Sequence, residues 1–313
     1  MDAEPLQIAV VGVGHLGRHH ARILSSMDGV RLLAVVDTKP GRAEEIASQT
    51  GTIGLTDYRQ LLERGVDGVV VAVPTEIHGE VAMPFLERGI AALVEKPMAH
   101  SLTEADAMLA AAAASGATLA VGQTERYNPA VATMLPLVTS PRFIEVHRLG
   151  AFSERSLDID VVFDVMIHDL DIILALVRSE VAAIEAVGVP VLTEKFDIAN
   201  ARLRFASGCI ANVTASRISR DRVRKIRFFQ PDAYLSIDYA AQEVEGWRLV
   251  RRDGQRPEIQ GGQIPVKQEE PLRRELVDFV RAVRERTPPI VDGAAGRRAL
   301  ALATEIAAKM ESV

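Results

Sequence analysis

The sequence predicts two domains: an α/β domain with a doubly wound parallel sheet over residues 1–123, and an α+β domain with a mostly antiparallel sheet over residues 124–313. A length of 313 residues exceeds what one hydrophobic core commonly serves. The first part alternates short apolar, β-branched runs with helical patterns, which is typical of a parallel sheet covered on both faces. The second part alternates apolar and polar residues, which indicates antiparallel strands with one solvent-exposed face.

Five apolar runs are expected to form the parallel strands of the first domain. They are "QIAVV", "RLLAVV", "GVVVAV", "IAALV" and "ATLAV". Helical patterns follow the first four, at residues 18–24, 41–48, 80–89 and 103–116. Ligands of such sheets bind outside the carboxyl ends of the strands, so the residues directly after each run are candidates for binding.

The second domain is expected to combine antiparallel strands with three long helices. The strands are "RFIEVHRL", "IANARLRFA", "CIANVTAS" and "AYLSIDY", and the helices are residues 160–177, 271–286 and 295–310. In "RYNPAV", Asn128 is expected to cap a short helix whose first position is Pro129.

The composition argues against several classes of protein. A net charge of −6 with 4% aromatic residues does not suit a nucleic-acid partner. No apolar stretch reaches the ~20 residues of a membrane span, and the first residues lack the pattern of a signal peptide. The one cysteine excludes an internal disulfide and fits a reducing compartment. We therefore expect a cytoplasmic protein.

A glycine-rich loop follows the first strand. Gly12, Gly14 and Gly17 form G-x-G-x-x-G at the start of a helix, and Asp37 ends the next strand, 20 positions after Gly17. The glycines allow a tight turn, a close approach of pyrophosphate and close helix packing, while the acid can bind the ribose hydroxyls. The pattern predicts NAD binding in preference to NADP, because Asp37 would repel a 2′-phosphate. Lys39 and Arg42 lie near enough to weaken that discrimination.

Other strand ends also bear polar residues. They are Pro74, Thr75 and His78 after the third run, Glu95 and Lys96 after the fourth, and Gln123 after the fifth. If a dinucleotide lies along this edge, Lys96 is expected near the nicotinamide. The alternatives are that Thr75 is only a helix cap, that His78 is incidental and that Lys96 is a solvated strand end.

The run "DIDVVFDVMIHDLDIIL" has polar residues along one face of an otherwise apolar helix. Asp160, Asp164, His168 and Asp171 recur at helical spacing. Three readings stay open: an acid–base pair of Asp164 and His168, a metal site, and buried salt bridges to arginines. Asp169 lies off this stripe and is expected to be structural. A nicotinamide site needs a partner that takes the hydroxyl proton, and Lys96, Asp164 and His168 can supply such a relay, with the primary base undecided between Lys96 and His168.

Together these motifs resemble the Gfo/Idh/MocA family of oxidoreductases. "AVVGVGHLG", "VAVPTEIHGEVA", "LVEKPMA", "VGQTERYNPAV" and "DVMIHDLDIIL" occur in the order seen in that family. The resemblance implies an N-terminal Rossmann domain, a C-terminal substrate-binding and oligomerisation domain, and oxidation of a sugar or cyclitol hydroxyl. It implies a catalytic trio of Lys96, Asp164 and His168, no catalytic metal, and a homodimer or homotetramer formed through the C-terminal sheet. It also implies cofactor contacts at Gly12, Val13, Gly14, His15, Leu16, Gly17, Asp37, Pro74, Thr75, His78, Glu95, Lys96 and Gln123.

Within the family, the chain looks most like the UDP-N-acetylglucosamine 3-dehydrogenases, whose 3-keto product is aminated for lipid A synthesis. A diphosphate substrate needs cations, and Arg126, Arg148 and Arg155 are candidates, with Tyr127 beside the cleft. The basic run from Ser216 to Arg227 is expected to be a solvated strand face or a subunit contact, with a phosphate contact as the alternative. The alternative functions are a free sugar or inositol dehydrogenase and a non-catalytic NAD-binding regulator.

Overall fold

The structure, a computed structural model, describes residues 4–152, 159–252 and 255–310. Its contacts divide the chain into two compact units, Met1–Gln123 with Leu272–Arg297, and Thr124–Pro271 with Arg298–Val313. The segment 272–297 thus belongs to the first unit, although the expected boundaries place it in the second domain. The reason is its apolar face, since Leu276 and Phe279 are fully buried in the core of the first unit.

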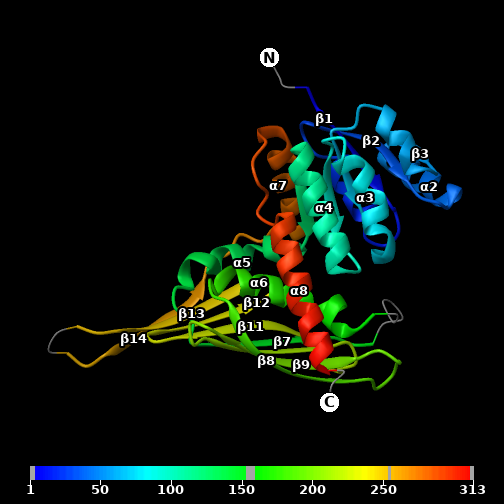
Figure 1. Cartoon of the computed structure of the whole chain (residues 1–313). Helices are drawn as coiled ribbons and strands as arrows, with labels where there is room; N and C mark the ends of the chain where they lie inside the picture. Colours follow the sequence, from blue (N-terminus) through cyan, green and yellow to red (C-terminus); the bar gives the residue numbers. More distant parts are fainter. Residues whose placement is uncertain (1–3, 153–158, 253–254, 311–313) are drawn as a thin grey trace. The chain divides into compact units, whose positions relative to one another are not determined.

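The first unit contains a parallel six-stranded sheet in the order β3-β2-β1-β4-β5-β6 (Figure 1). Its strands are β1 (Leu6–Val11), β2 (Val30–Val36), β3 (Ile53–Leu55), β4 (Gly68–Val71), β5 (Ala91–Glu95) and β6 (Leu119–Gly122). The predicted doubly wound parallel sheet is confirmed. The strand order reverses at β1, between β2 and β4, which is where such sheets bind dinucleotides.

Helices flank this sheet. They are α1 (Gly17–Leu24), α2 (Pro40–Thr50), α3 (His78–Leu86), α4 (Leu102–Ser115) and α7 (Pro271–Glu285), with 3₁₀ turns η1 (Tyr58–Glu63) and η2 (Thr75–Ile77). Helix α4 illustrates how local sequence sets the bounds. The Ser101 side chain accepts a hydrogen bond from the Glu104 backbone N–H, and Gly116, with φ +75°, ends the helix in a left-handed conformation.

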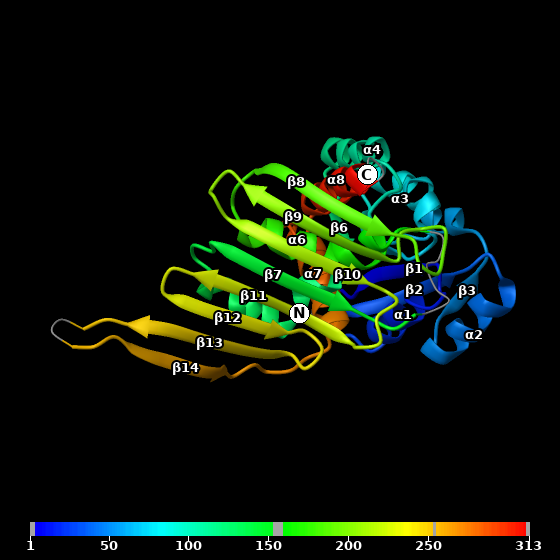
Figure 2. The ribbon, with the colours of Figure 1, turned by 90° about the horizontal axis from the view of Figure 1, so that it is seen from below.

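The second unit contains an eight-stranded sheet in the order β14-β13-β12-β11-β7-β10-β9-β8 (Figure 2). Its strands are β7 (Phe143–Leu149), β8 (Val181–Val189), β9 (Ile198–Phe205), β10 (Ile210–Ser216), β11 (Val223–Gln230), β12 (Ala233–Asp238), β13 (Glu243–Val250) and β14 (Glu258–Ile264). Only β10 and β7 pair in parallel among these described strands. The predicted mostly antiparallel sheet is confirmed.

Helical segments cover one face of this sheet (Figure 1). They are η3 (Thr124–Tyr127), α5 (Pro129–Met134), η4 (Leu135–Leu137), η5 (Val162–Met166), α6 (Ile167–Leu176) and the part of α8 (Gly293–Met310) after residue 297. The Asn128 side chain accepts from the Ala130 backbone N–H with Pro129 at the first helical position, as predicted. The apolar side of α6 packs on the inward-facing side chains of the strands, which form the core of this unit.

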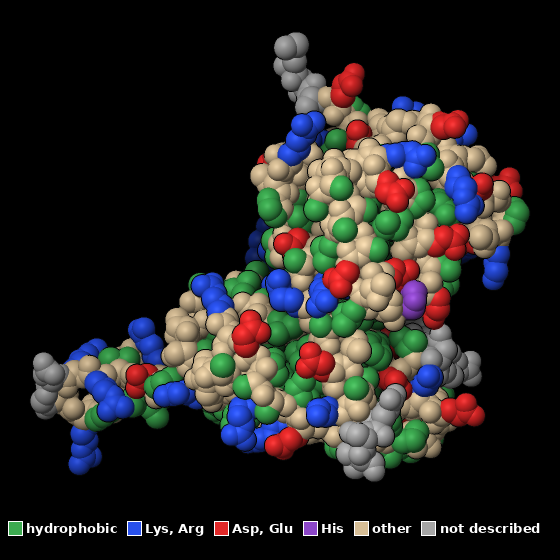
Figure 3. All heavy atoms as spheres, viewed as in Figure 1, with side chains coloured by type: hydrophobic (Ala, Val, Ile, Leu, Met, Phe, Trp, Pro, Cys, Tyr) green, Lys and Arg blue, Asp and Glu red, His purple; other side chains and the backbone are tan. Residues whose placement is uncertain are grey.

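Basic and acidic side chains are interspersed over each unit on the face drawn in Figure 3. Among the residues that the structure describes, every helix falls short of the length or the apolarity that a bilayer crossing requires.

Candidate functional site

The glycine loop lies between β1 and α1 and is tightly packed underneath. Gly12 has φ +86°, and a Cβ there would lie 2.5 Å from the Ala72 carbonyl oxygen. A Cβ on Gly17 would overlap the carbonyl oxygen of Gly12, whereas a Cβ on Gly14 would meet no atom within 4 Å. Two glycines therefore serve packing within the chain, while the third leaves open space where a pyrophosphate can approach.

A cavity of about 470 Å³ opens beside this loop, lined in part by Gly12, Gly14, Asp37, Tyr58 and Pro74. The Asp37 carboxylate accepts hydrogen bonds from the backbone N–H groups of Val13 (3.2 Å) and Lys39 (3.0 Å), which fixes its position at the cavity wall.

Arg42 binds the loop instead of facing the cavity as a free cation. Its Nε donates to the Val13 carbonyl (2.8 Å), and its Nη1 pairs with Glu45 (2.7 Å). These contacts hold the Arg42 guanidinium against the loop and pair it with Glu45, while Lys39 is exposed.

The first turn of α1 suits an anion. It contains no acidic side chain, and Leu16 at the N-cap makes no side-chain capping bond. The N–H groups of Arg18, His19 and His20 donate to the carbonyls of Gly14 and Leu16, so the attraction that this turn offers to phosphate oxygens comes mainly from the helix dipole. His15 is exposed and lies edge-on to His19, with ring centroids 5.8 Å apart.

His78 lies between the backbone segments that follow β4 and β5. It is buried, and its ring nitrogens lie 3.0 Å from the carbonyl oxygens of Pro97 and Val73. Burial lowers the pKa of His78 despite these two carbonyls, which favours the neutral ring. A neutral ring has one N–H and donates to one of these two carbonyls, that of Pro97 after Lys96 or that of Val73 after β4. Nearby, Pro74 is exposed and Thr75 begins η2.

Three predicted site residues lie at the ends of β5 and β6. Glu95 is buried and accepts a hydrogen bond from the Lys96 backbone N–H (3.2 Å). The Lys96 side chain is half-buried. Gln123 is 1% exposed, and its Oε1 has no hydrogen-bond partner among the described residues. A buried acceptor of this kind is suited to a donor from a ligand.

In the second unit, Asp164 and His168 lie on consecutive turns of the helix formed by η5 and α6, and both are half-buried. The long helix predicted for residues 160–177 is present, but its first turn is not α-helical. Residues Val162–Met166 form a π-helix, and the Ile167 N–H bonds the Val162 carbonyl five residues earlier. A wider turn changes the angle between Asp164 and His168 relative to a regular helix, and such turns are frequent at functional sites.

The next two carboxylates of this helix are held by arginines. Arg148 donates to both oxygens of Asp169 (2.6 and 2.9 Å) and to Glu125 (3.2 Å). Burial opposes the charge on Arg148, but Asp169 and Glu125 outweigh it and raise the pKa of this guanidinium. Arg126 donates to both oxygens of Asp171, each at 2.9 Å.

Through these pairs Arg126 and Arg148 support α6, and Arg148 is only 5% exposed. The structural role expected for Asp169 is confirmed. Tyr127 is buried, and Arg155 lies outside the described residues.

The prediction of a solvated or subunit-facing role is wrong for Arg217, the first arginine of the basic run. Arg217 is buried, and its Nε donates to the buried Asp197 (2.9 Å) while its Nη1 donates to the Ile159 carbonyl (2.8 Å). The cause is the loop before β9, which places Asp197 under the end of β10.

Comparison with known proteins identifies the family. Residues 6–123 match the family model described as an oxidoreductase family with an NAD-binding Rossmann fold, and residues 140–231 match the GFO/IDH/MocA C-terminal domain. The chain belongs to the Gfo/Idh/MocA family. It is therefore an NAD-binding oxidoreductase.

Two curated family members differ in how much of the chain they match. The UDP-N-acetylglucosamine 3-dehydrogenase of Acidithiobacillus ferrooxidans is 35% identical over 311 residues, covering 98% of both chains. The scyllo-inositol 2-dehydrogenase (NAD(+)) of Bacillus subtilis is 30% identical and covers 68% of both.

Solved structures of the family share this fold. That of the A. ferrooxidans enzyme superposes with a TM-score of 0.92 at 34% identity, covering 99% of both chains. Levoglucosan dehydrogenase in complex with NADH gives a TM-score of 0.86 at 18% identity.

Three residues of polar clusters were not anticipated from the sequence. His20 and Glu275 meet Glu95 inside the first unit, and Asp197 meets Arg217 in the second. For His20 a signal existed, because it lies one turn after Gly17 on the face of α1 that packs inward.

Proposed function

We propose that this chain oxidises C3 of UDP-N-acetylglucosamine to the 3-keto sugar with NAD. The observation that supports this substrate is the similarity to a UDP-N-acetylglucosamine 3-dehydrogenase along 98% of both chains, whereas the inositol dehydrogenase matches only 68%. We further propose that the product is aminated for lipid A synthesis, and that the second unit's sheet joins copies into a homodimer or homotetramer.

The residues of the first unit fit NAD. The open space over Gly14, the uncapped first turn of α1 and the cavity wall at Asp37 suit a pyrophosphate and an adenosine ribose. The buried Gln123 Oε1 suits a donor such as the amide of a nicotinamide. When bound, NAD supplies a hydride acceptor.

The remaining chemistry belongs to three side chains. We propose that Lys96 donates a hydrogen bond to the substrate hydroxyl, and that Lys96 or His168 takes its proton as the hydride leaves carbon. Asp164, one turn before His168 on the same helix, orients the imidazole and stabilises its protonated form. The Arg148–Asp169 and Arg126–Asp171 pairs hold α6 directly after His168, so that the imidazole keeps one orientation.

The test is turnover, followed as reduced nicotinamide, with NAD and a panel of free and UDP-linked sugars and inositols. We expect reduction of NAD with UDP-N-acetylglucosamine. The Lys96→Ala variant is expected to lose at least about 100-fold in kcat while still binding NAD. Lys267→Ala is the matched control, because the Lys267 side chain is 90% exposed. Turnover of an inositol but not of the nucleotide sugar would replace the proposed substrate, and no turnover with any alcohol would refute the proposed reaction.

A further inference from the structure

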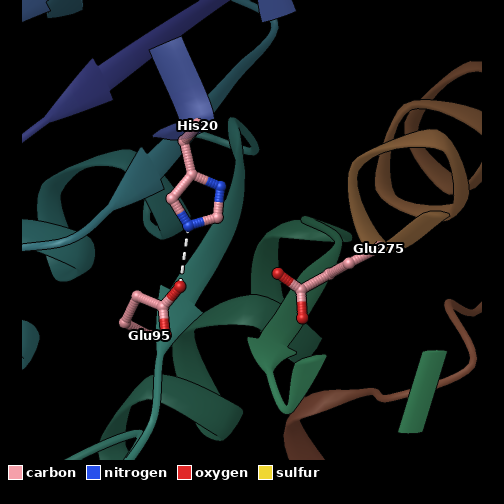
Figure 4. A group of neighbouring side chains, drawn as sticks. All are labelled: His20, Glu95 and Glu275. Carbon is pink, nitrogen blue, oxygen red and sulfur yellow. Dashed lines mark hydrogen bonds and ion pairs between the residues drawn. The ribbon is translucent and has the colours of Figure 1, made fainter. Parts of the chain in front are cut away.

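A buried polar cluster joins three elements of the first unit. His20 comes from α1, Glu95 from the end of β5 and Glu275 from α7, and their side chains approach one another in the interior (Figure 4). The exposed fractions are 0%, 5% and 0%, and one donor or acceptor atom from each residue lies within 4.8 Å of the other two. Groups of this kind are costly to bury unless they are paired and hydrogen-bonded.

The Glu95 carboxylate is the centre of the arrangement, because its two oxygens serve different elements. Oε1 lies 2.7 Å from His20 Nε2, and Oε2 accepts from the Lys96 backbone N–H at 3.2 Å. A third element is close, since a Cβ on Gly122 at the end of β6 would lie 2.8 Å from this carboxylate. The carboxylate therefore connects the helix that begins at the glycine loop with the strand end that presents Lys96.

We propose that His20 is a positioning residue for the oxidation. Its Nε2–H fixes the Glu95 carboxylate, which in turn fixes the Lys96 backbone relative to the glycine loop. This inference rests on the proposed role of Lys96. Without the imidazole, the buried Glu95 carboxylate loses a charge-assisted hydrogen bond and reorients. Its Oε2 is then no longer in position to accept the hydrogen bond from the Lys96 backbone N–H. A displacement of the order of 1 Å at a catalytic group can lower the rate about 100-fold.

Two substitutions of His20 separate positioning from general packing. In His20→Gln the amide nitrogen reaches about as far as Nε2 and can donate to Glu95, whereas the shorter side chain of His20→Asn cannot. We expect His20→Gln to retain kcat within about 3-fold and His20→Asn to lose about 10- to 100-fold, with the KM for NAD changing less than about 3-fold.

An exposed pair provides the matched control. His100 lies 2.8 Å from Glu104 with a 54% exposed side chain, so His100→Gln and His100→Asn are expected to leave kcat unchanged.

A second readout needs no substrate. The Lys96 backbone amide is expected to keep its protection against hydrogen exchange in His20→Gln and to lose it in His20→Asn, measured by NMR on the whole chain. If the parent enzyme oxidises none of the sugars, the proposed function fails, and the exchange of this amide still decides the role of His20.

Three outcomes would overturn the inference. His20→Asn could leave both kcat and the Lys96 amide as in the parent. Both His20 variants could lose kcat equally, in step with a lower unfolding temperature, which indicates a structural role alone. Finally, the purified chain could contain one equivalent of a divalent cation that Glu275→Gln removes, which would make the cluster a metal site.

Discussion

Replacing Asp197 by Asn tests whether a single buried carboxylate holds the beginning of the helix that bears Asp164. Asp197 Oδ2 accepts from the backbone N–H groups of Val191 (2.9 Å), Leu192 (2.6 Å) and Thr193 (2.9 Å). Its Oδ1 accepts from Arg217 Nε and from Thr193 Oγ1, both at 2.9 Å. Arg217 also binds the Ile159 carbonyl, one residue before Asp160.

The size of the effect follows from these contacts. In Asp197→Asn the amide oxygen can still face the three backbone donors, but the amide nitrogen then faces two more donors, Arg217 and Thr193. Arg217 stays buried without its counter-charge, and breaking one side of a buried ion pair costs about 3–5 kcal/mol. We expect the free energy of unfolding of the second unit to fall by that amount.

The effect should also depend on pH. Three backbone N–H groups, Arg217 and Thr193 oppose the effect of burial and hold the pKa of Asp197 well below its ordinary value. A carboxyl whose folded pKa lies below its unfolded value of about 3.9 contributes stability above that value and loses it as the pH falls through the folded pKa. The difference between parent and Asp197→Asn should thus be constant above about pH 5 and shrink below about pH 4.

Urea unfolding monitored by the one tryptophan, Trp247 in β13, reports on this unit. The control is Asp232→Asn, whose exposed pair with Arg251 spans 3.6 Å and should contribute less than about 0.5 kcal/mol. A loss below about 1 kcal/mol for Asp197→Asn, or a difference from the parent that persists unchanged at pH 3, would refute the reasoning.

Three further predictions concern the two units. Gly17→Ala should lower the unfolding temperature, because its Cβ overlaps the loop, whereas Gly14→Ala should unfold like the parent yet bind NAD at least about 10-fold more weakly in a fluorescence titration. Asp37→Ala should lower the ratio of kcat/KM for NAD over NADP by about 10- to 100-fold, because the ribose loses an acceptor and the 2′-phosphate loses a repulsion. Arg148→Lys cannot reproduce the bidentate bonds to Asp169 and should cost about 3 kcal/mol in urea unfolding.

The sequence predicts the first unit well because its signals are local. Five of the six parallel strands are compact apolar runs that end at a turn residue, and the glycine loop requires its spacing for reasons of backbone geometry. The short edge strand β3, with the sequence "IGL", has no such run and was not predicted. Contacts between segments far apart in the sequence were harder to predict. Helix α7 has an ordinary amphipathic pattern, which shows that one face is buried but not in which unit.

The π-helical turn at Val162–Met166 shows a second limit. Its sequence, "VFDVM", suits an α-helix as well as a π-helix, since both bury apolar side chains on one side. The residues just before this turn are bound by Phe196 and Arg217, which lie far along the chain, so a local pattern does not contain these contacts. The Phe196 N–H donates to the Asp160 carboxylate at 2.9 Å, and Arg217 binds the carbonyl before it.

The polar residues along one face of this helix bind different partners, and their spacing in the sequence does not predict which partner each one binds. Asp160 holds the backbone of Phe196, and Asp171 is held by both nitrogens of the Arg126 fork, so these two members are accounted for within the fold. Asp164 and His168 are half-buried, and they are the two members that we propose for acid–base chemistry. The structural and the catalytic readings of the stripe are therefore compatible. Asp171 is 1% exposed and both its oxygens are bound by Arg126, so it can orient the helix but is poorly placed to exchange protons with a substrate, whereas Asp164 and His168 are partly exposed.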